Sequence, residues 1–304
     1  MLKYLVYRLS NSLSYVAPWY LVLLFVFSMM ALHGQEDPIA AAKPQPIRNT
    51  FQSIWLLDNQ TVDIPFHKTL EWDIQHRFGT WDNGYEDYYG LAAPSNIRLG
   101  FNYVLLEDFQ IGLGITKERK LWDFNVKYAI LRQSRDNSLP ISITYFGVAG
   151  IDSRKLDRFE ESSDRFSYFN QIMIARQFSE RFSLQLAPSF SYFNSAEVML
   201  DAGGAFLGHM NNTHFAVSAM GRFGLTDAIG LIISTDIPVT DHDFNNPKKN
   251  LAFGIEFTTS SHAFQIFVGN YQTLIPQYNH LLNQNTFGDN QILLGFNISR
   301  LWNF

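Results

Sequence analysis

Charged side chains recur at every second position of the first long alternating segment, and they are the residues best placed to act on a solute. Glu71, Asp73 and Arg77 share one face of this segment, and Arg98 lies on the matching face of the next. Alternate side chains of an extended chain point to opposite faces, so these four point away from the apolar residues between them. The same face carries Asp123, Lys127, Arg222, Asp236 and Glu256 on later segments.

Charges of both signs on the inner wall of a barrel could line a constriction and select solutes by their electric field, as charged rings do in pores. The alternative is that they pair with one another and brace a closed lumen, because small barrels commonly fill their interiors with side chains. For a single residue the bracing interpretation is favoured. For the set, a polar constriction is a fair hypothesis.

The most ligand-like cluster is Asp241-His242-Asp243, with Asp236 nearby. Two carboxylates and an imidazole could hold a divalent cation. The chain continues Phe244-Asn245-Asn246-Pro247, which is ordinary turn composition. We therefore expect a solvated loop here, and neither a metal nor a cofactor.

Acyl transfer needs an imidazole beside a hydroxyl, and outer-membrane lipases and deacylases place His and Ser two residues apart on a strand. The sequence contains no His-x-Ser. A lipid-modifying enzyme is therefore a weaker hypothesis than a channel or a barrel that docks a partner protein, although folding could still bring distant residues together. The histidines after residue 34 are scattered over several segments: His67, His76, His209, His214, His242, His262 and His280.

Alternation with period two begins at Thr69 and predicts the elements that must position these residues. Tight turns such as Glu107-Asp108 and Ser179-Glu180 alternate with longer polar loops near 79–95, 151–164, 193–211, 239–249 and 271–289. Only Lys117 to Lys120 is short where a long loop is due. Twelve strands are predicted, near 69–78, 97–105, 109–116, 121–132, 140–150, 165–178, 182–192, 212–223, 228–238, 250–259, 262–270 and 290–304.

Composition excludes several classes of protein. Hydrophobic residues make up 46% of the chain, yet the mean hydropathy is −0.08, so apolar and polar residues are interleaved. A net charge of −5 provides no basic surface for nucleic acid. The absence of cysteine removes disulfides, thiolate metal sites and a lipoprotein anchor.

Residues 1–34 are expected to be a cleaved signal peptide, with Lys3 and Arg8 before an apolar stretch from Leu21 to Leu32. An uncleaved anchor is the alternative. Residues 35–68 form a proline-bearing lead-in, and 69–304 the barrel. The lead-in contains an apolar cluster within Thr50 to Val62, which would be costly to expose because burying each large side chain contributes roughly 1.5–3 kcal/mol. We expect this cluster to contact the barrel mouth or enter the lumen as a partial plug. One more short strand is the alternative.

A closed, antiparallel, up-and-down transmembrane β-barrel explains the pattern better than a soluble sandwich. Many segments approach the roughly 9–11 residues that cross hydrocarbon at a tilt, whereas sandwich strands are commonly about 5–6. Closure follows because an open sheet edge in lipid leaves backbone groups unpaired. The last segment alternates to its end at Phe304, as in barrels recognised by the barrel-assembly machinery, with Ser299 where Gly is usual. Aromatic residues predicted for interfacial girdles are Phe109, Trp122, Phe166, Tyr192, Phe223 and Trp302.

Several stretches together resemble an uncharacterised family of single-chain outer-membrane β-barrels, known only as a domain of unknown function. They are His76-Arg77-Phe78-Gly79, Asn96 to Gly100, Lys127-Tyr128 with Leu131-Arg132-Gln133, and Gly295 to Arg300. The resemblance covers the chain from about Thr50 to its end. It implies fold and location and carries no substrate or catalytic residue.

The sequence thus predicts a monomer surrounded by outer-membrane lipids, with both termini in the periplasm. Twelve strands enclose a narrower lumen than the 16–18 of general porins, which suits a narrow channel for small polar solutes. A non-transporting barrel, whose long loops 193–211 and 271–289 dock an envelope protein, is the alternative.

Overall fold

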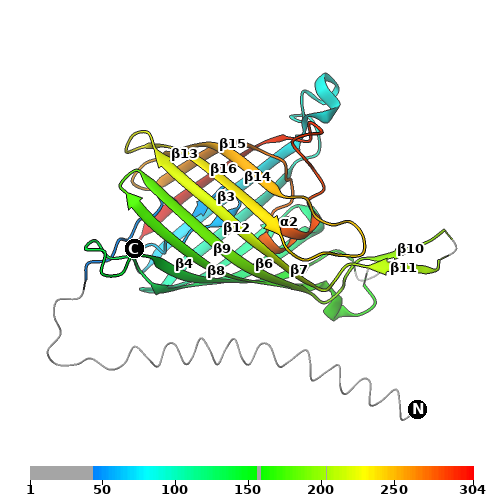
Figure 1. Ribbon diagram of the computed structural model, residues 1–304, viewed down its shortest axis with the longest axis horizontal. Coiled ribbons are helices and arrows are strands. Elements are labelled where there is room, and N and C mark those ends of the chain that lie inside the picture. Colours follow the sequence, from blue (N-terminus) through cyan, green and yellow to red (C-terminus); the bar gives the residue numbers. More distant parts are fainter. Residues whose placement is uncertain (1–43, 156–158, 203) are drawn as a thin grey trace, which may run out of the picture. The chain divides into compact units, whose positions relative to one another are not determined.

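Twelve strands form one closed antiparallel barrel within residues 44–155, 159–202 and 204–304, the residues that the computed structural model describes (Figure 1). Each wall strand pairs with its neighbour along the chain, and the last strand pairs with the first, with Ile298 opposite Ile74. The wall strands are β3 (Thr69–Thr80), β4 (Asn96–Leu106), β5 (Phe109–Thr116), β6 (Leu121–Leu131), β7 (Ser142–Asp152), β8 (Phe166–Ser179), β9 (Phe182–Phe193), β12 (Thr213–Gly224), β13 (Ile229–Pro238), β14 (Asn250–Thr258), β15 (His262–Gly269) and β16 (Leu293–Asn303).

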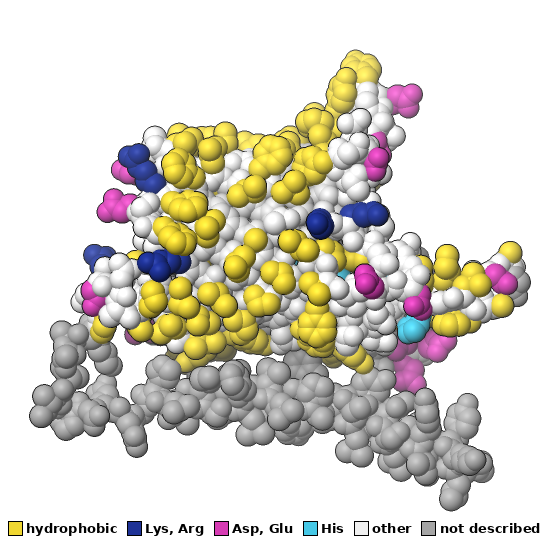
Figure 2. Space-filling model, in the orientation of Figure 1, with side chains coloured by type: hydrophobic (Ala, Val, Ile, Leu, Met, Phe, Trp, Pro, Cys, Tyr) yellow, Lys and Arg dark blue, Asp and Glu magenta, His cyan; other side chains and the backbone are white. Residues whose placement is uncertain are grey.

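Alternation of side chains explains why these segments form a wall. Along β3 every second residue is buried inside the barrel, while the residues between them face outward. The outward positions are apolar, as at Phe101, Phe124 and Ile233, and they form a hydrophobic belt (Figure 2). An apolar belt outside and polar residues inside is the arrangement that acyl chains require. The predicted fold class and strand positions are confirmed.

The two ends of the barrel differ. One end, here the turn end, carries the short connections, such as Glu107-Asp108 and Glu180-Arg181. The other, here the loop end, carries the long ones, including η1 (Trp81–Asp87), η4 (Ser162–Arg165), the hairpin of β10 (Val198–Leu200) and β11 (Phe206–His209), and α2 (Pro276–Leu282). The connection with η2 (Glu118–Lys120) is at the same end and is short, as predicted. The predicted alternation of connection lengths is confirmed, whereas the hairpin and α2 were not predicted.

Two chain segments fill the barrel interior. Residues 50–64, which we call the plug hairpin, contain β1 (Trp55–Leu56) paired with β2 (Asn59–Gln60). Helix α2 belongs to the loop between β15 and β16 and is buried from Pro276 to Leu281. Trp55, Leu56 and Leu57 form one apolar cluster with wall residues and with α2. Thus the α2 part of loop 271–289 lies in the lumen, whereas the whole loop was predicted to face outward, with docking of a partner protein as the alternative hypothesis.

The predicted signal peptide and residues 35–43 lie outside the described residues. In the described part of the chain, no helix has the length and apolar character needed to cross a membrane.

Candidate functional site

The plug hairpin rises from the turn end and is held by polar side chains of the wall. Gln185 on β9 accepts a hydrogen bond from the Val62 backbone N–H at 2.9 Å. On β7, Thr144 donates to the Val62 carbonyl at 2.8 Å. Gln265 on β15 accepts from the Leu57 N–H at 3.0 Å. Backbone groups inside a lumen need such partners. The hairpin is therefore attached to several sides of the barrel.

The tip of the hairpin meets α2 in the middle of the lumen. Asp58 accepts hydrogen bonds from Asn279 on α2 and from Tyr271, whose hydroxyl lies 2.7 Å from Oδ1. The neighbouring Asn59 donates to Asp236 on β13 at 3.0 Å. The plug from the turn end and the helix from the loop end therefore contact each other inside the barrel.

Arg98 joins three wall strands through two carboxylates. Its Nη1 donates to Asp73 on β3 at 2.8 Å, and its Nη2 and Nε donate to Asp123 on β6 at 2.7 and 2.9 Å. All three side chains are at most 3% exposed. On the lumen side, Trp55 of the plug hairpin covers the guanidinium, 5.1 Å from the ring. Each buried carboxylate thus has a close cationic partner, and loss of Arg98 would leave both acids without one.

A glycine provides the space for this ion cluster. Arg98 and Asp123 reach each other across the backbone of β5 at Gly114. A Cβ added there would lie 2.4 Å from both Arg98 Nη2 and Asp123 Oδ2. Only glycine permits this close approach of side chains to a strand.

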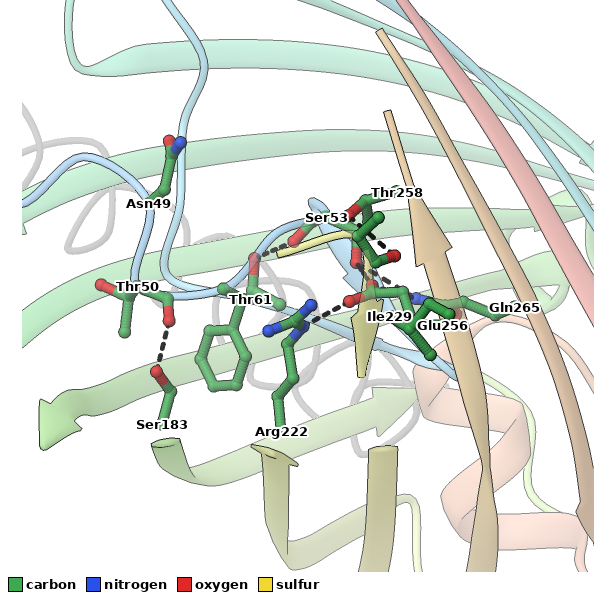
Figure 3. A network of polar contacts seen from close by, with 12 residues as sticks. Asn49, Thr50, Ser53, Thr61, Ser183, Arg222, Ile229, Glu256, Thr258 and Gln265 are labelled. Atoms are coloured by element: carbon green, nitrogen blue, oxygen red, sulfur yellow. Dashed lines mark hydrogen bonds and ion pairs between the residues drawn. The ribbon is translucent and has the colours of Figure 1, made fainter. Parts of the chain in front are cut away.

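A second ion cluster lies nearer the turn end (Figure 3). Glu256 on β14 accepts from Arg222 Nε on β12 at 2.5 Å and from Ser53 of the plug hairpin at 2.5 Å. Gln265 also donates to Glu256, at 3.0 Å. Ser183 on β9 donates to the Thr50 carbonyl at 2.5 Å, where the hairpin enters the lumen. The plug hairpin thus adds Ser53 and Thr50 to the hydrogen bonds formed by the wall side chains.

All nine predicted constriction residues lie inside the barrel and are at most 5% exposed. They do not form one ring. Lys127 donates to Gln60 and to the Asp63 carbonyl, and Arg77 donates to Asn297 and to the Leu57 carbonyl. The structure brings together Asp73, Arg98 and Asp123, with Glu71 linked to them through Asn102, and separately Arg222 with Glu256. Their role in solute selection stays a prediction.

The triplet Asp241-His242-Asp243 does not converge on one point. Asp243 contacts His209 at 3.2 Å, while His242 stacks on His214 with its Nε2 3.1 Å from Nδ1. Burial lowers the pKa of His242 although Asp241 and Asp243 oppose the shift. Across the described residues, no group of three His, Asp or Glu side chains could hold a metal. The side chains of His242 and Asp243 thus have separate partners in this loop.

One Ser, His and Asp set does come together, although no sequence spacing pointed to it. His280 on α2 lies 3.4 Å from Ser189 Oγ and 3.4 Å from Asp236 Oδ1. Both distances exceed the roughly 2.6–3.2 Å that efficient proton transfer requires. Ser189 instead donates to the Ala216 carbonyl at 3.2 Å. We interpret this set as the attachment of α2 to the wall.

Sequence reasoning missed the uncharged residues that hold the plug. Gln185, Gln265 and Asn297 are ordinary inward amides by their spacing, and nothing in the sequence marks them as partners of residues 50–64. The apolar cluster around Trp55 was the signal for the plug hairpin. No comparable signal identified α2.

The family model described as Membrane bound beta barrel domain (DUF5777) matches residues 51–302. The chain belongs to this family. The match includes most of the plug hairpin together with the wall, so the membrane-bound barrel and the segment inside it belong to the same family domain.

No curated protein matches the sequence. Among solved structures, the COG4313 outer membrane channel from Pseudomonas putida F1 is 11% identical with a TM-score of 0.49, covering 79% of this chain and 97% of that one. The NanC porin is 9% identical with a TM-score of 0.47, covering 77% and 99%. The KdgM porin is 8% identical with a TM-score of 0.44, covering 78% and 99%.

Proposed function

We propose that this protein is a gated, narrow channel for small polar solutes in the outer membrane, and that the plug hairpin and α2 hold it closed. Short turns at one end and long loops at the other are typical of bacterial outer-membrane barrels, whose turns face the periplasm. On that basis the turn end and Phe304 lie in the periplasm, and the loop end faces outward.

The observation that carries this proposal is that the plug leaves several polar side chains of the wall without a hydrogen-bond partner among the described residues. Both amide atoms of Gln110 and both of Asn125 are buried without a hydrogen-bond partner among the described residues, as is Asn102 Oδ1. Buried polar groups without partners are costly, at about 1–3 kcal/mol each. These side chains on β4, β5 and β6 would be hydrated if the plug withdrew. The wall is thus suited to a water-filled lumen, which favours an open state.

The hairpin is also placed for withdrawal through the turn end. Residues before it run along that end, where the Ile47 N–H donates to the Gln133 carbonyl at 2.7 Å. Arg48 contacts Glu107 there at 2.7 Å, and both side chains are solvent-accessible. Exposed ion pairs contribute at most about 1 kcal/mol, so this attachment can open readily.

A disulfide between plug and wall tests the proposal. The natural chain contains no cysteine, so Thr50→Cys with Ser183→Cys introduces one defined pair at positions that already touch. In planar bilayers we expect the oxidised pair to stay closed and reduction to restore opening. A variant lacking residues 45–64 should conduct continuously. Ser183→Cys alone is the control.

Two results would contradict the channel. The first is equal current from the oxidised and reduced pair. The second is a plug-deleted barrel that is folded but carries no current. A folded barrel is recognised by its altered mobility in unheated detergent gels.

Docking of a partner protein is the second candidate, and the β10–β11 hairpin favours it. Val198, Leu200, Phe206 and Leu207 are 55%, 56%, 63% and 59% exposed on this projection from the loop end (Figure 2). Exposed apolar patches mark protein-interaction sites. A photo-crosslinker at position 206 in intact cells should capture one defined envelope protein. Capture of lipid alone would reject this role.

A further inference from the structure

A cavity of about 220 Å³ lies at the loop end, directly on α2. Its apolar lining includes Phe193, Tyr278, Leu281 and Leu282, and the rings of Phe193 and Tyr278 pack edge to face at 5.2 Å. Ligand sites for drug-sized molecules are commonly about 300–1,000 Å³. This cavity therefore suits a molecule with the size of a single amino acid rather than an oligosaccharide.

One cation that lines the cavity has no acidic partner among the described residues. The Arg119 guanidinium lies over the Tyr278 ring, 5.6 Å from its centroid, and its buried Nε has no hydrogen-bond partner among the described residues. Arg119 also has a φ of +55°, a conformation that non-glycine residues keep mainly where function or packing demands it. The other lining arginine, Arg154, is different because it is paired with Asp152 through three contacts of 2.5–3.0 Å.

One anion in the same cavity likewise lacks a basic partner within the part of the chain that the structure describes. Glu197 is exposed at the rim, and within the described part of the chain its carboxylate forms neither a hydrogen bond nor an ion pair. The remaining acid, Asp164, accepts a hydrogen bond from the Glu161 N–H at 2.9 Å. Arg119 and Glu197 therefore carry opposite charges in one cavity without neutralising each other.

We propose that this cavity binds a zwitterion with an apolar side chain, namely an α-amino acid of the phenylalanine or leucine type. The ligand carboxylate pairs with Arg119, because a guanidinium fork matches a carboxylate. The ammonium group pairs with Glu197. The side chain lies against Phe193, Tyr278 and Leu281. The role of this cavity as the recognition site for a transported solute rests on the proposed channel. Binding of the amino acid does not depend on it.

The position on α2 connects this site with the plug. Tyr278 and Leu281 face the cavity, while the adjacent Asn279 and His280 contact Asp58 and Asp236. An occupant of the cavity thus touches the same short helix that holds the tip of the plug hairpin.

Calorimetric titration of the full barrel in detergent tests the proposal with four probes. L-Phenylalanine carries both charges and the ring, 3-phenylpropionate lacks the ammonium group, phenethylamine lacks the carboxylate, and glycine lacks the side chain. We expect L-phenylalanine to bind at least about tenfold more tightly than each of the others, since charge-assisted hydrogen bonds inside a cavity are strong.

Two variants assign the charges. Arg119→Gln should make L-phenylalanine and phenethylamine bind equally, and Glu197→Gln should make L-phenylalanine and 3-phenylpropionate bind equally. Arg181→Gln, which removes an exposed charge in the turn between β8 and β9, is the matched control and should leave all four affinities unchanged. Gel mobility without heating verifies that each variant is folded.

The site proposal is overturned if 3-phenylpropionate binds the natural protein as tightly as L-phenylalanine, if neither variant changes the order of the probes, or if no probe binds. These outcomes are separate from failure of the channel. A barrel that binds L-phenylalanine but never conducts would reject the channel and keep the site, and one that conducts without binding would do the reverse.

Discussion

Replacing Trp55 by alanine should shift the proposed channel toward its open state. Trp55 is 5% exposed, its ring packs edge to face on Phe146 at 6.3 Å, and it covers the Arg98 guanidinium at 5.1 Å. All of these contacts exist only while the plug hairpin is in the lumen. Truncation of a buried Phe or Trp to alanine costs about 3–5 kcal/mol.

That loss can be converted into a gating change. Because about 1.4 kcal/mol corresponds to a factor of ten, the ratio of open to closed channels should rise by about 100-fold to a few thousand-fold. Single-channel recording at low protein density measures this ratio directly. The matched control is Trp122→Ala, because Trp122 lies on the outer face and is 42% exposed.

Two outcomes would refute the reasoning. One is an equal open fraction for Trp55→Ala and Trp122→Ala. The other is a Trp55→Ala barrel that melts at a much lower temperature while its conductance is unchanged, since Trp55 would then stabilise the wall rather than the closed state.

Three further predictions concern the wall and a loop. Arg98→Gln leaves Asp73 and Asp123 buried without their partner and should destabilise the barrel by about 3–5 kcal/mol in urea titrations, whereas Arg132→Gln, beside the half-exposed Asp108, should cost at most about 1 kcal/mol. Gly114→Ala should cost about 1–3 kcal/mol by displacing Arg98, and Gly288→Ala, whose added Cβ would meet Thr286 Oγ1 at an unstrained 3.9 Å, should be neutral in the same titration. Burial lowers the pKa of His242, so the folded loop favours the neutral imidazole. The contribution of His242 to the stability of this loop is therefore complete above about pH 6.5, and it is lost as the pH falls through the folded pKa. Proteolysis of loop 239–249 should therefore accelerate on acidification, and His242→Gln should show no such acceleration; equal pH profiles for both would contradict it.

The fold was predictable because each wall strand has its own signal. Alternation along Thr69–Thr80 or Asn96–Leu106 is local and repeats with each strand, and closure follows from the cost of unpaired backbone groups in lipid. The inward direction of Glu71, Asp73 and Arg98 followed from the same period of two.

The partners of those residues were not predictable, because they depend on contacts between distant parts of the chain. Arg98 pairs with Asp123 across an intervening strand, and Ser53 meets Glu256, which is 203 residues away. Amphipathic periodicity needs several turns of helix to be recognised. Helix α2, with seven residues, is too short for that, so its position inside the lumen could only come from the structure.

The plug hairpin has a consequence for biogenesis. Every wall residue that grips it comes later in the chain, up to Asn297, which is 240 residues beyond Leu57. A polypeptide that is exported amino end first therefore delivers the plug hairpin before the wall strands that hold it. During insertion, the last strands must either close around a hairpin that is already in place or leave an opening wide enough for the hairpin to enter later. A barrel that closed too early would leave the hairpin outside and the lumen unfilled.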